Sequence, residues 1–181
     1  MIRKIISGGQ TGADRAALDV AIKFNIPHGG WIPKGRKAED GRLPDKYRLQ
    51  EMPTASYQAA IEKNVLESDG TLIFIRGGPT EEIIYTLKML QKHNGKMFSI
   101  DLNMPTSYDA ASLILSWMKL QNMKNINVTG PRASEDTKIY LDVFRVLEMA
   151  YVINKIEGLK SGTLPKTVEE AIDIVLAEVY R

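Results

Sequence analysis

Short apolar runs alternate with amphipathic segments along most of the chain. The apolar runs predict strands over residues 2–6, 26–30, 71–75, 96–102 and 125–129. Between them, apolar residues recur on one helical face and predict helices over residues 11–24, 54–66, 79–93 and 105–120, and then a long helix that the segment 130–134 opens and that ends near 156. We expect Pro79 as the first residue of its helix and Ser134 as the N-cap of the long helix.

This alternation predicts an α/β fold, because each strand–helix–strand unit places its second strand parallel to the first. We expect a single Rossmann-like domain over residues 1–181, a three-layer sandwich with a mainly parallel sheet and helices on both faces. The length of 181 residues suits one domain, and no internal repeat or linker interrupts it. An extra C-terminal helix is expected over about 165–181, where Thr167 and Glu170 form a capping box.

The composition narrows the possible chemistry. There is no cysteine, which excludes disulfides, thiolate zinc sites and cysteine nucleophiles. The two histidines, His28 and His93, leave little material for an imidazole cage, so we expect no protein-ligated metal. A formal net charge of +2 gives no reason to expect a nucleic acid partner. No apolar run approaches the roughly 20 residues needed to span a bilayer, and no signal peptide is visible, so we expect a cytoplasmic protein without a membrane partner.

Glycine occurs at the ends of three predicted strands, in Gly8-Gly9, Gly77-Gly78 and Gly130. In an open parallel sheet, ligands bind beyond the carboxyl ends of the strands. Glycine lets the backbone approach a ligand closely, and the helix that follows offers free N–H groups and the positive end of its dipole. The three loops together therefore predict a binding crevice for an anionic group.

The first loop has glycines near the spacing of a dinucleotide fingerprint, with Ser7, Gly9 and Gly12 in place of the three glycines. It is not a Walker loop, because no Lys-Ser or Lys-Thr pair follows. A dinucleotide site also needs an acid at the end of the second strand, but residues 27–30 read Pro-His-Gly-Gly. We therefore expect no NAD.

The anion expected at the first loop is a phosphate-bearing ligand. The residues that would bind it are Gly8, Gly9, Gln10, Thr11 and Gly12. The alternative for the glycines is a plain tight turn. For Thr11 and Asp14, the alternative is that they only cap the helix.

The second loop is another candidate anion cradle, made by Gly77, Gly78 and Thr80. In this arrangement Glu81 or Glu82 would contact a sugar hydroxyl. The alternative is an ordinary helix start, since acids are favourable in the first turn of a helix.

Basic side chains are further candidates for binding the negative charge of the ligand. Arg132 follows the third glycine loop, and arginine suits bidentate phosphate recognition, although a solvent-facing role is the alternative. Prolines and glycines break any regular pattern in the segment 31–52, so we expect an irregular loop there. The segment is too long to serve only as a connection, and it contains Lys34 and Arg36, which are placed to grip a polyanion. Trp31 would stack on a ring or pack into the core. Because acids nearly balance the bases of this segment, its charges are alternatively only solvated.

Two long strings of this sequence resemble signatures of the family named putative molybdenum cofactor carrier proteins. They are SGGQTGADRAALD at 7–19, which includes Arg15, and PHGGWIPKGRKAEDG at 27–41. The resemblance continues through Asn64-Val65 and 130–132, and covers about residues 3–145. The family is similar to the LOG phosphoribohydrolases and related nucleotide sensors of the SLOG superfamily.

The resemblance implies a homo-oligomer, either a homodimer or a homotetramer, that holds a phosphorylated pterin or nucleotide at the strand ends. In that arrangement residues 8–12 line the anion site, Arg15 of the first signature adjoins them, and the loop after the third strand completes it. The sequence departs from the LOG motif Pro-Gly-Gly-x-Gly-Thr-x-x-Glu, because its third loop reads Arg-Gly-Gly-Pro-Thr-Glu-Glu.

Three functions follow from these observations. The favoured one is a binding protein that carries the molybdenum cofactor or a related phosphorylated small molecule. The second is an enzyme that hydrolyses the N-glycosidic bond of a nucleoside 5′-monophosphate, with Glu82, Glu81 or Asp14 as candidate catalytic residues. The third is a nucleotide-sensing module.

Overall fold

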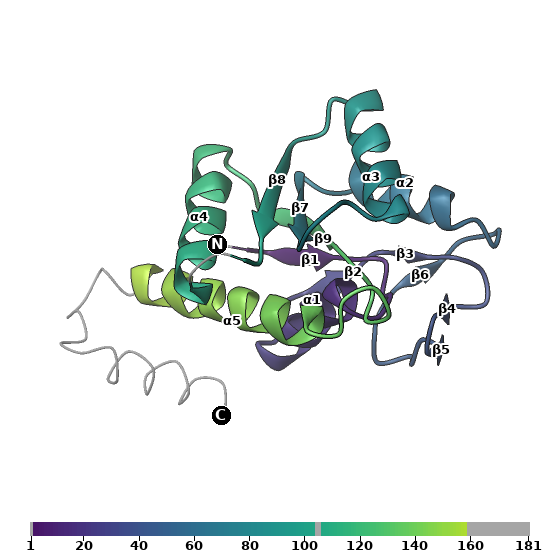
Figure 1. The fold of residues 1–181 in the computed structure, drawn as a ribbon, viewed down its shortest axis with the longest axis horizontal. Coiled ribbons are helices and arrows are strands. Elements are labelled where there is room, and N and C mark those ends of the chain that lie inside the picture. Colours follow the sequence, from purple (N-terminus) through teal and green to yellow (C-terminus); the bar gives the residue numbers. More distant parts are fainter. Residues whose placement is uncertain (1, 104–105, 159–181) are drawn as a thin grey trace.

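The computed structural model describes residues 2–103 and 106–158. Its centre is a five-stranded parallel sheet with the strand order β2-β1-β9-β7-β8 (Figure 1). The strands are β1 (Lys4–Ile6), β2 (His28–Gly29), β7 (Gly70–Ile75), β8 (Met97–Asp101) and β9 (Asn125–Thr129). The predicted α/β fold with a mainly parallel sheet is confirmed, and each of these strands lies inside or within one residue of its predicted range.

The apolar sequence of β7 fits its place inside the sheet. Leu72 pairs with Phe98 on one side and with Val128 on the other. Leu72, Ile73 and Phe74 are all buried. Because successive side chains of a strand point to opposite faces, a continuous apolar run requires cover on both faces.

Helices supply that cover on both faces, as predicted (Figure 1). Helix α5 (Ile139–Gly158) packs against both α1 (Ala13–Lys23) and α4 (Ser107–Leu120), and the three helices share the main core with the sheet. Helices α2 (Tyr57–Leu66) and α3 (Glu81–Lys92) pack together over the other face. The buried face of α1 carries alanines, whose small side chains let the helix lie close to the sheet and to α5.

The path of the chain creates a switch point in the sheet. From β1 the chain passes through α1 to β2 at one edge, and from β7 it passes through α3 to β8 at the other edge. The last strand, β9, then inserts between β1 and β7. The helices that follow β1 and β7 therefore leave on opposite faces. In open α/β sheets ligands bind beyond the strand ends at such a point, and we call the space between the loops after β1, β7 and β9 the crevice.

The segment after β2 is more ordered than predicted. It contains four short strands, β3 (Trp31–Ile32), β4 (Lys37–Ala38), β5 (Gly41–Arg42) and β6 (Gln50–Glu51). Strand β3 pairs with β6, and β4 with β5 forms an antiparallel hairpin. The segment also buries a core of its own against α1, made by Leu18, Ile32, Leu43, Tyr47 and Leu49. The expectation of an irregular segment was wrong in this respect.

The predicted roles of Pro79 and Ser134 at helix starts were also wrong. Helix α3 begins at Glu81 with Thr80 as its N-cap, because the Thr80 hydroxyl accepts the Ile83 N–H and Pro79 offers no such side-chain oxygen. Helix α5 begins at Ile139, five residues beyond Ser134, whose hydroxyl donates to another part of the chain instead. The predicted C-terminal helix lies outside the described residues. In the part of the chain that is described, no helix is long and apolar enough to cross a membrane.

Candidate functional site

The loops after β1 and β9 are in direct contact at the carboxyl end of the sheet. Gly12 has a φ of 74°, and a Cβ placed on it would lie 2.3 Å from the Pro131 carbonyl oxygen. Only glycine fits this close approach. The contact is fixed by hydrogen bonds from the Ala13 N–H to Pro131 O (3.1 Å) and from the Ala133 N–H to Thr11 Oγ1 (3.1 Å).

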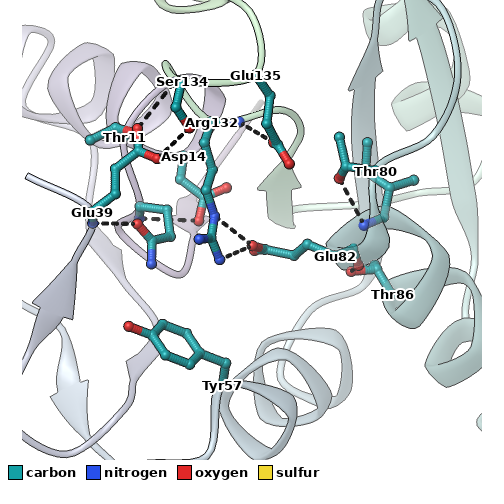
Figure 2. A network of polar contacts seen from close by, with 12 residues as sticks. Thr11, Asp14, Glu39, Tyr57, Thr80, Glu82, Thr86, Arg132, Ser134 and Glu135 are labelled. Carbon is teal, nitrogen blue, oxygen red and sulfur yellow. Dashed lines mark hydrogen bonds and ion pairs between the residues drawn. The ribbon is translucent and has the colours of Figure 1, made fainter.

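Arg132 joins the loop after β9 to helix α3. Its Nη2 lies 2.9 Å and its Nε 3.3 Å from Glu82 Oε2, so the guanidinium spans the crevice (Figure 2). The ring of Tyr57, at the start of α2, lies on the other side, with its centroid 5.8 Å from the guanidinium carbon. Three of the elements around the crevice thus meet at one arginine.

A second carboxyl group, that of Asp14, lies beneath this ion pair and is buried. Burial raises the pKa of Asp14 to about 8, and repulsion from Glu82 acts in the same direction. Hydrogen bonds from the Gln10 N–H and from the hydroxyls of Ser7 and Thr129 oppose this shift without cancelling it. At neutral pH the buried acid is therefore mostly protonated.

A cavity of about 20 Å³ adjoins the two acids, which is space for about one water molecule. Its lining is mainly polar and comes from the loop after β1, from helices α1, α2 and α3, and from strand β9. The residues are Gly8, Asp14, Ile61, Asn64, Glu82, Thr86, Asn127 and Thr129. The cavity extends the polar environment of Asp14 into the interior.

The residues predicted from the first loop lie together at the crevice. The Gln10 side-chain oxygen accepts the Glu39 N–H (3.1 Å), and Arg15 donates to Asp40 (3.0 Å) and to the Gly9 carbonyl (3.3 Å). The N-cap of α1 is Gly12, and no side chain of the described residues caps it. The alternative that Thr11 and Asp14 cap this helix is therefore wrong.

The second loop contributes in a different way from the first. Thr80 caps α3, and Glu82 turns to Arg132 while Glu81 stays exposed. A Cβ on Gly77 or Gly78 would meet no described atom within 4 Å. These two glycines therefore border open space at the crevice.

Arg36 does not point to the crevice in the way that its sequence position suggested. It is buried, and its guanidinium donates to the carbonyls of Leu43, Pro44, Tyr47 and Leu49 at 2.8–3.3 Å. These hydrogen bonds stabilise the conformation of residues 36–49. The Arg36 guanidinium is therefore engaged inside the protein rather than at the crevice. Lys34, in the same segment, is exposed.

Sequence reasoning missed three residues of the site. Glu39, from the β4–β5 hairpin, accepts hydrogen bonds from Thr11 and Ser134. Asn64 of α2 holds Trp31 by accepting its N–H (2.7 Å) and donating to its carbonyl (3.1 Å). Tyr57 is 40% exposed although aromatic. The family resemblance includes Asn64 and could have indicated it. Glu39 could not be distinguished from the other acids that nearly balance the bases of its segment.

Two comparisons with known proteins bear on this site. A family model described as the circularly permutated YpsA SLOG family matches residues 5–151. The chain belongs to this family. The resemblance to a SLOG family seen in the sequence is thereby confirmed.

A crystal structure at 1.45 Å, described as that of a "Putative molybdenum carrier protein" from Syntrophus aciditrophicus SB, is similar over nearly its whole length. The two sequences are 50% identical, the TM-score is 0.80, and the match covers 82% of this chain and 94% of that one. Comparison with curated proteins gave no match. Within the described residues, no group of three or more histidines and acids is arranged to hold a metal ion.

Proposed function

We propose that this protein binds a phosphorylated small molecule in the crevice at the carboxyl ends of β1, β7 and β9. The observation that carries the proposal is the position of Arg132. Its guanidinium crosses the crevice between the glycine loop 8–12 and helix α3, and it is only part-buried. An arginine in such a place can turn its two parallel N–H groups to a phosphate.

The ligand class that we infer is the molybdenum cofactor or a related nucleotide, carried without turnover. Both combine a planar ring system with a phosphate group. The exposed ring of Tyr57 beside Arg132 offers a stacking surface for the ring system, and Gly77 and Gly78 leave room beside it. The 50% identical relative is described as a "Putative molybdenum carrier protein", which supports a molybdenum-related ligand. The protein would hold such a cofactor through its organic part.

A thermal-shift screen tests this function. A pterin phosphate or nucleotide at 100 times its Kd should stabilise the folded protein by about 2.7 kcal/mol, which raises the melting temperature by several degrees. Arg132→Ala should weaken binding by roughly tenfold or more, since it removes a charge-assisted contact. Arg42→Ala is the matched control, because Arg42 is exposed and pairs with Asp45 outside the crevice. If no pterin, nucleotide or phosphate raises the melting temperature, the proposal is wrong.

A second candidate function is hydrolysis of the N-glycosidic bond of a nucleoside 5′-monophosphate. The observation that favours it is the pair of unlike acids, with Asp14 protonated near neutral pH beside Glu82. In this reaction the bond between the ribose carbon and the base breaks. The base leaves with the electron pair and takes the proton of Asp14, while water adds to the ribose and gives its proton to Glu82.

Incubation with AMP and chromatography of the products decides between carrying and cleaving. Hydrolysis predicts adenine release that Asp14→Asn and Glu82→Gln each abolish. Glu81→Gln is the control, because Glu81 precedes Glu82 on α3 and is exposed. Binding of AMP without adenine release would leave carrying as the function.

We also infer a homodimer or homotetramer. Helix α4 exposes large apolar side chains, with Tyr108 at 59% and Leu113 at 45%. A second copy of the chain would cover such residues. Light scattering at micromolar concentration should give a mass of two or four chains, and a monomer mass would contradict the inference.

A further inference from the structure

The Glu39 carboxylate lies among hydrogen-bond donors that belong to the two strand-end loops (Figure 2). Ser134 donates through its hydroxyl (2.7 Å) and through its N–H (3.2 Å), and the Thr11 hydroxyl donates to the same carboxylate. Thr11 follows β1 and Ser134 follows β9, so the donors come from the two loops that meet at the edge of the crevice. Clustered N–H and O–H donors of this kind also suit the oxygens of a phosphate.

The groups around Glu39 favour the charged form of its carboxyl group. Burial acts in the opposite direction, but the hydrogen bonds from Thr11 and Ser134 and the charge of Arg132 together lower the pKa of Glu39. Glu39 is nevertheless exposed. An exposed contact between charged and polar groups contributes little net free energy, so an anion with more charge can replace it.

The hairpin that carries Glu39 covers the glycine loop. Its Glu39 N–H donates to Gln10 Oε1 (3.1 Å), and Asp40 pairs with Arg15, which also donates to the Gly9 carbonyl. Each of these contacts ends on loop 8–12 or on the first turns of α1. Movement of the hairpin together with the displaced Glu39 carboxylate would break these contacts and free one side of the loop proposed to bind the ligand.

We propose that the donors of Thr11 and Ser134 form an anion subsite, and that Glu39 fills it as an internal competitor until an oxyanion of the ligand displaces it. This rests on the proposed function, because it assigns one phosphate of that ligand to the subsite. The β4–β5 hairpin then acts as a gate that opens as the anion binds. Glu39 is a residue that sets affinity, since no reacting atom touches it.

The experiment measures the binding of inorganic phosphate and of AMP to the full chain by calorimetry. Glu39→Ala should bind both probes roughly tenfold more tightly than wild type, because it removes the competitor and keeps the donors. Asp45→Ala is the control, since it removes an exposed carboxylate from the same segment and its ion-pair partners are Arg36 and Arg42. Adding Thr11→Val and Ser134→Ala to Glu39→Ala should abolish the gain. Circular dichroism checks that each variant is folded.

The outcomes separate this proposal from the proposed function. If wild type binds AMP and Glu39→Ala binds it no more tightly, the subsite proposal is overturned and the proposed function stands. If Glu39→Ala binds phosphate through Thr11 and Ser134, but wild type binds neither probe and no pterin phosphate raises its melting temperature, the subsite stands and the proposed function fails. If neither protein binds either probe, the subsite proposal is wrong, and the proposed function fails with it when no pterin phosphate raises the melting temperature.

Discussion

At the scale of single residues, the site is built around a carboxylic acid that the fold keeps protonated. Asp14 stands in the first turn of α1, a position that normally favours a charged acid. Here burial and the neighbouring Glu82 outweigh that preference and raise the pKa of Asp14 to about 8. The residue type could be read from the sequence, but its protonation depends on two elements that meet only in the fold.

The raised pKa of Asp14 predicts that the stability of the protein depends on pH, and that Asp14→Asn removes this dependence. The folded-state pKa of Asp14, about 8, lies above its ordinary value of 3.8. Its contribution to stability is therefore fully present below pH 3.8 and is lost as pH rises through about 8. The free energy of unfolding of Asp14→Asn should exceed that of wild type increasingly over this range, by on the order of a few kcal/mol at pH 8.

Urea denaturation at several pH values measures the difference. Asp45→Asn serves as the control, because its carboxylate is exposed although it pairs with Arg36 and Arg42, and the plot of its free energy of unfolding against pH should run parallel to that of wild type. If the free energy of unfolding of Asp14→Asn also ran parallel to that of wild type over this pH range, Asp14 would not be the cause of the pH dependence.

At the scale of elements, the structure differs most from the sequence-based prediction in the segment between β2 and α2. Its prolines, glycines and balanced charges predicted an irregular loop with solvated bases. In the fold, Arg36 is buried and donates to four carbonyls, and Leu43 and Leu49 pack against Leu18 of α1. Nothing in the local sequence distinguishes Arg36 from Arg42, which is exposed, because the carbonyls that Arg36 binds converge only when the segment folds.

Arg36→Lys should therefore loosen this segment while the central sheet stays intact. Lysine keeps the charge but cannot reach four carbonyls with one ammonium group, so we expect a loss of roughly 2–4 kcal/mol of stability. Hydrogen–deuterium exchange should rise over residues 36–49 and stay unchanged in β7. Arg42→Lys is the matched control and should change stability by less than about 0.5 kcal/mol. Equal exchange in the two variants would contradict the structural role.

At the scale of the whole molecule, the layers meet at Gly130, where β9 ends. A Cβ on Gly130 would lie 2.8 Å from the Ala13 Cβ and 2.8 Å from the Phe74 carbonyl oxygen. One glycine thus sets the distance between the sheet and helix α1. The same approach brings the loops after β1 and β9 together, so the packing of the layers and the shape of the site have one origin.

Gly130→Ala should destabilise the protein by about 1–3 kcal/mol, because the added methyl group forces α1 away from the sheet. Gly78→Ala is the control, since its methyl group would meet no described atom within 4 Å, and it should be nearly neutral. Midpoints of urea denaturation compare the two. If the midpoints of Gly130→Ala and Gly78→Ala were similar, α1 would be able to move away from the sheet with little loss of stability.

The sequence by itself determined the order along the chain of the five central strands and the helices between them, the parallel sheet and the three glycine loops at its carboxyl edge. It did so because the periodicity of apolar residues and the positions of glycine are local properties of the chain. Only the tertiary structure decided which polar groups meet: Arg132 with Glu82, Asp14 with its buried surroundings, and Glu39 with Thr11 and Ser134. The hydrogen bonds of Arg132 and Glu39 join residues 28 to 95 positions apart, and their partners follow from the packing of whole layers rather than from any local pattern.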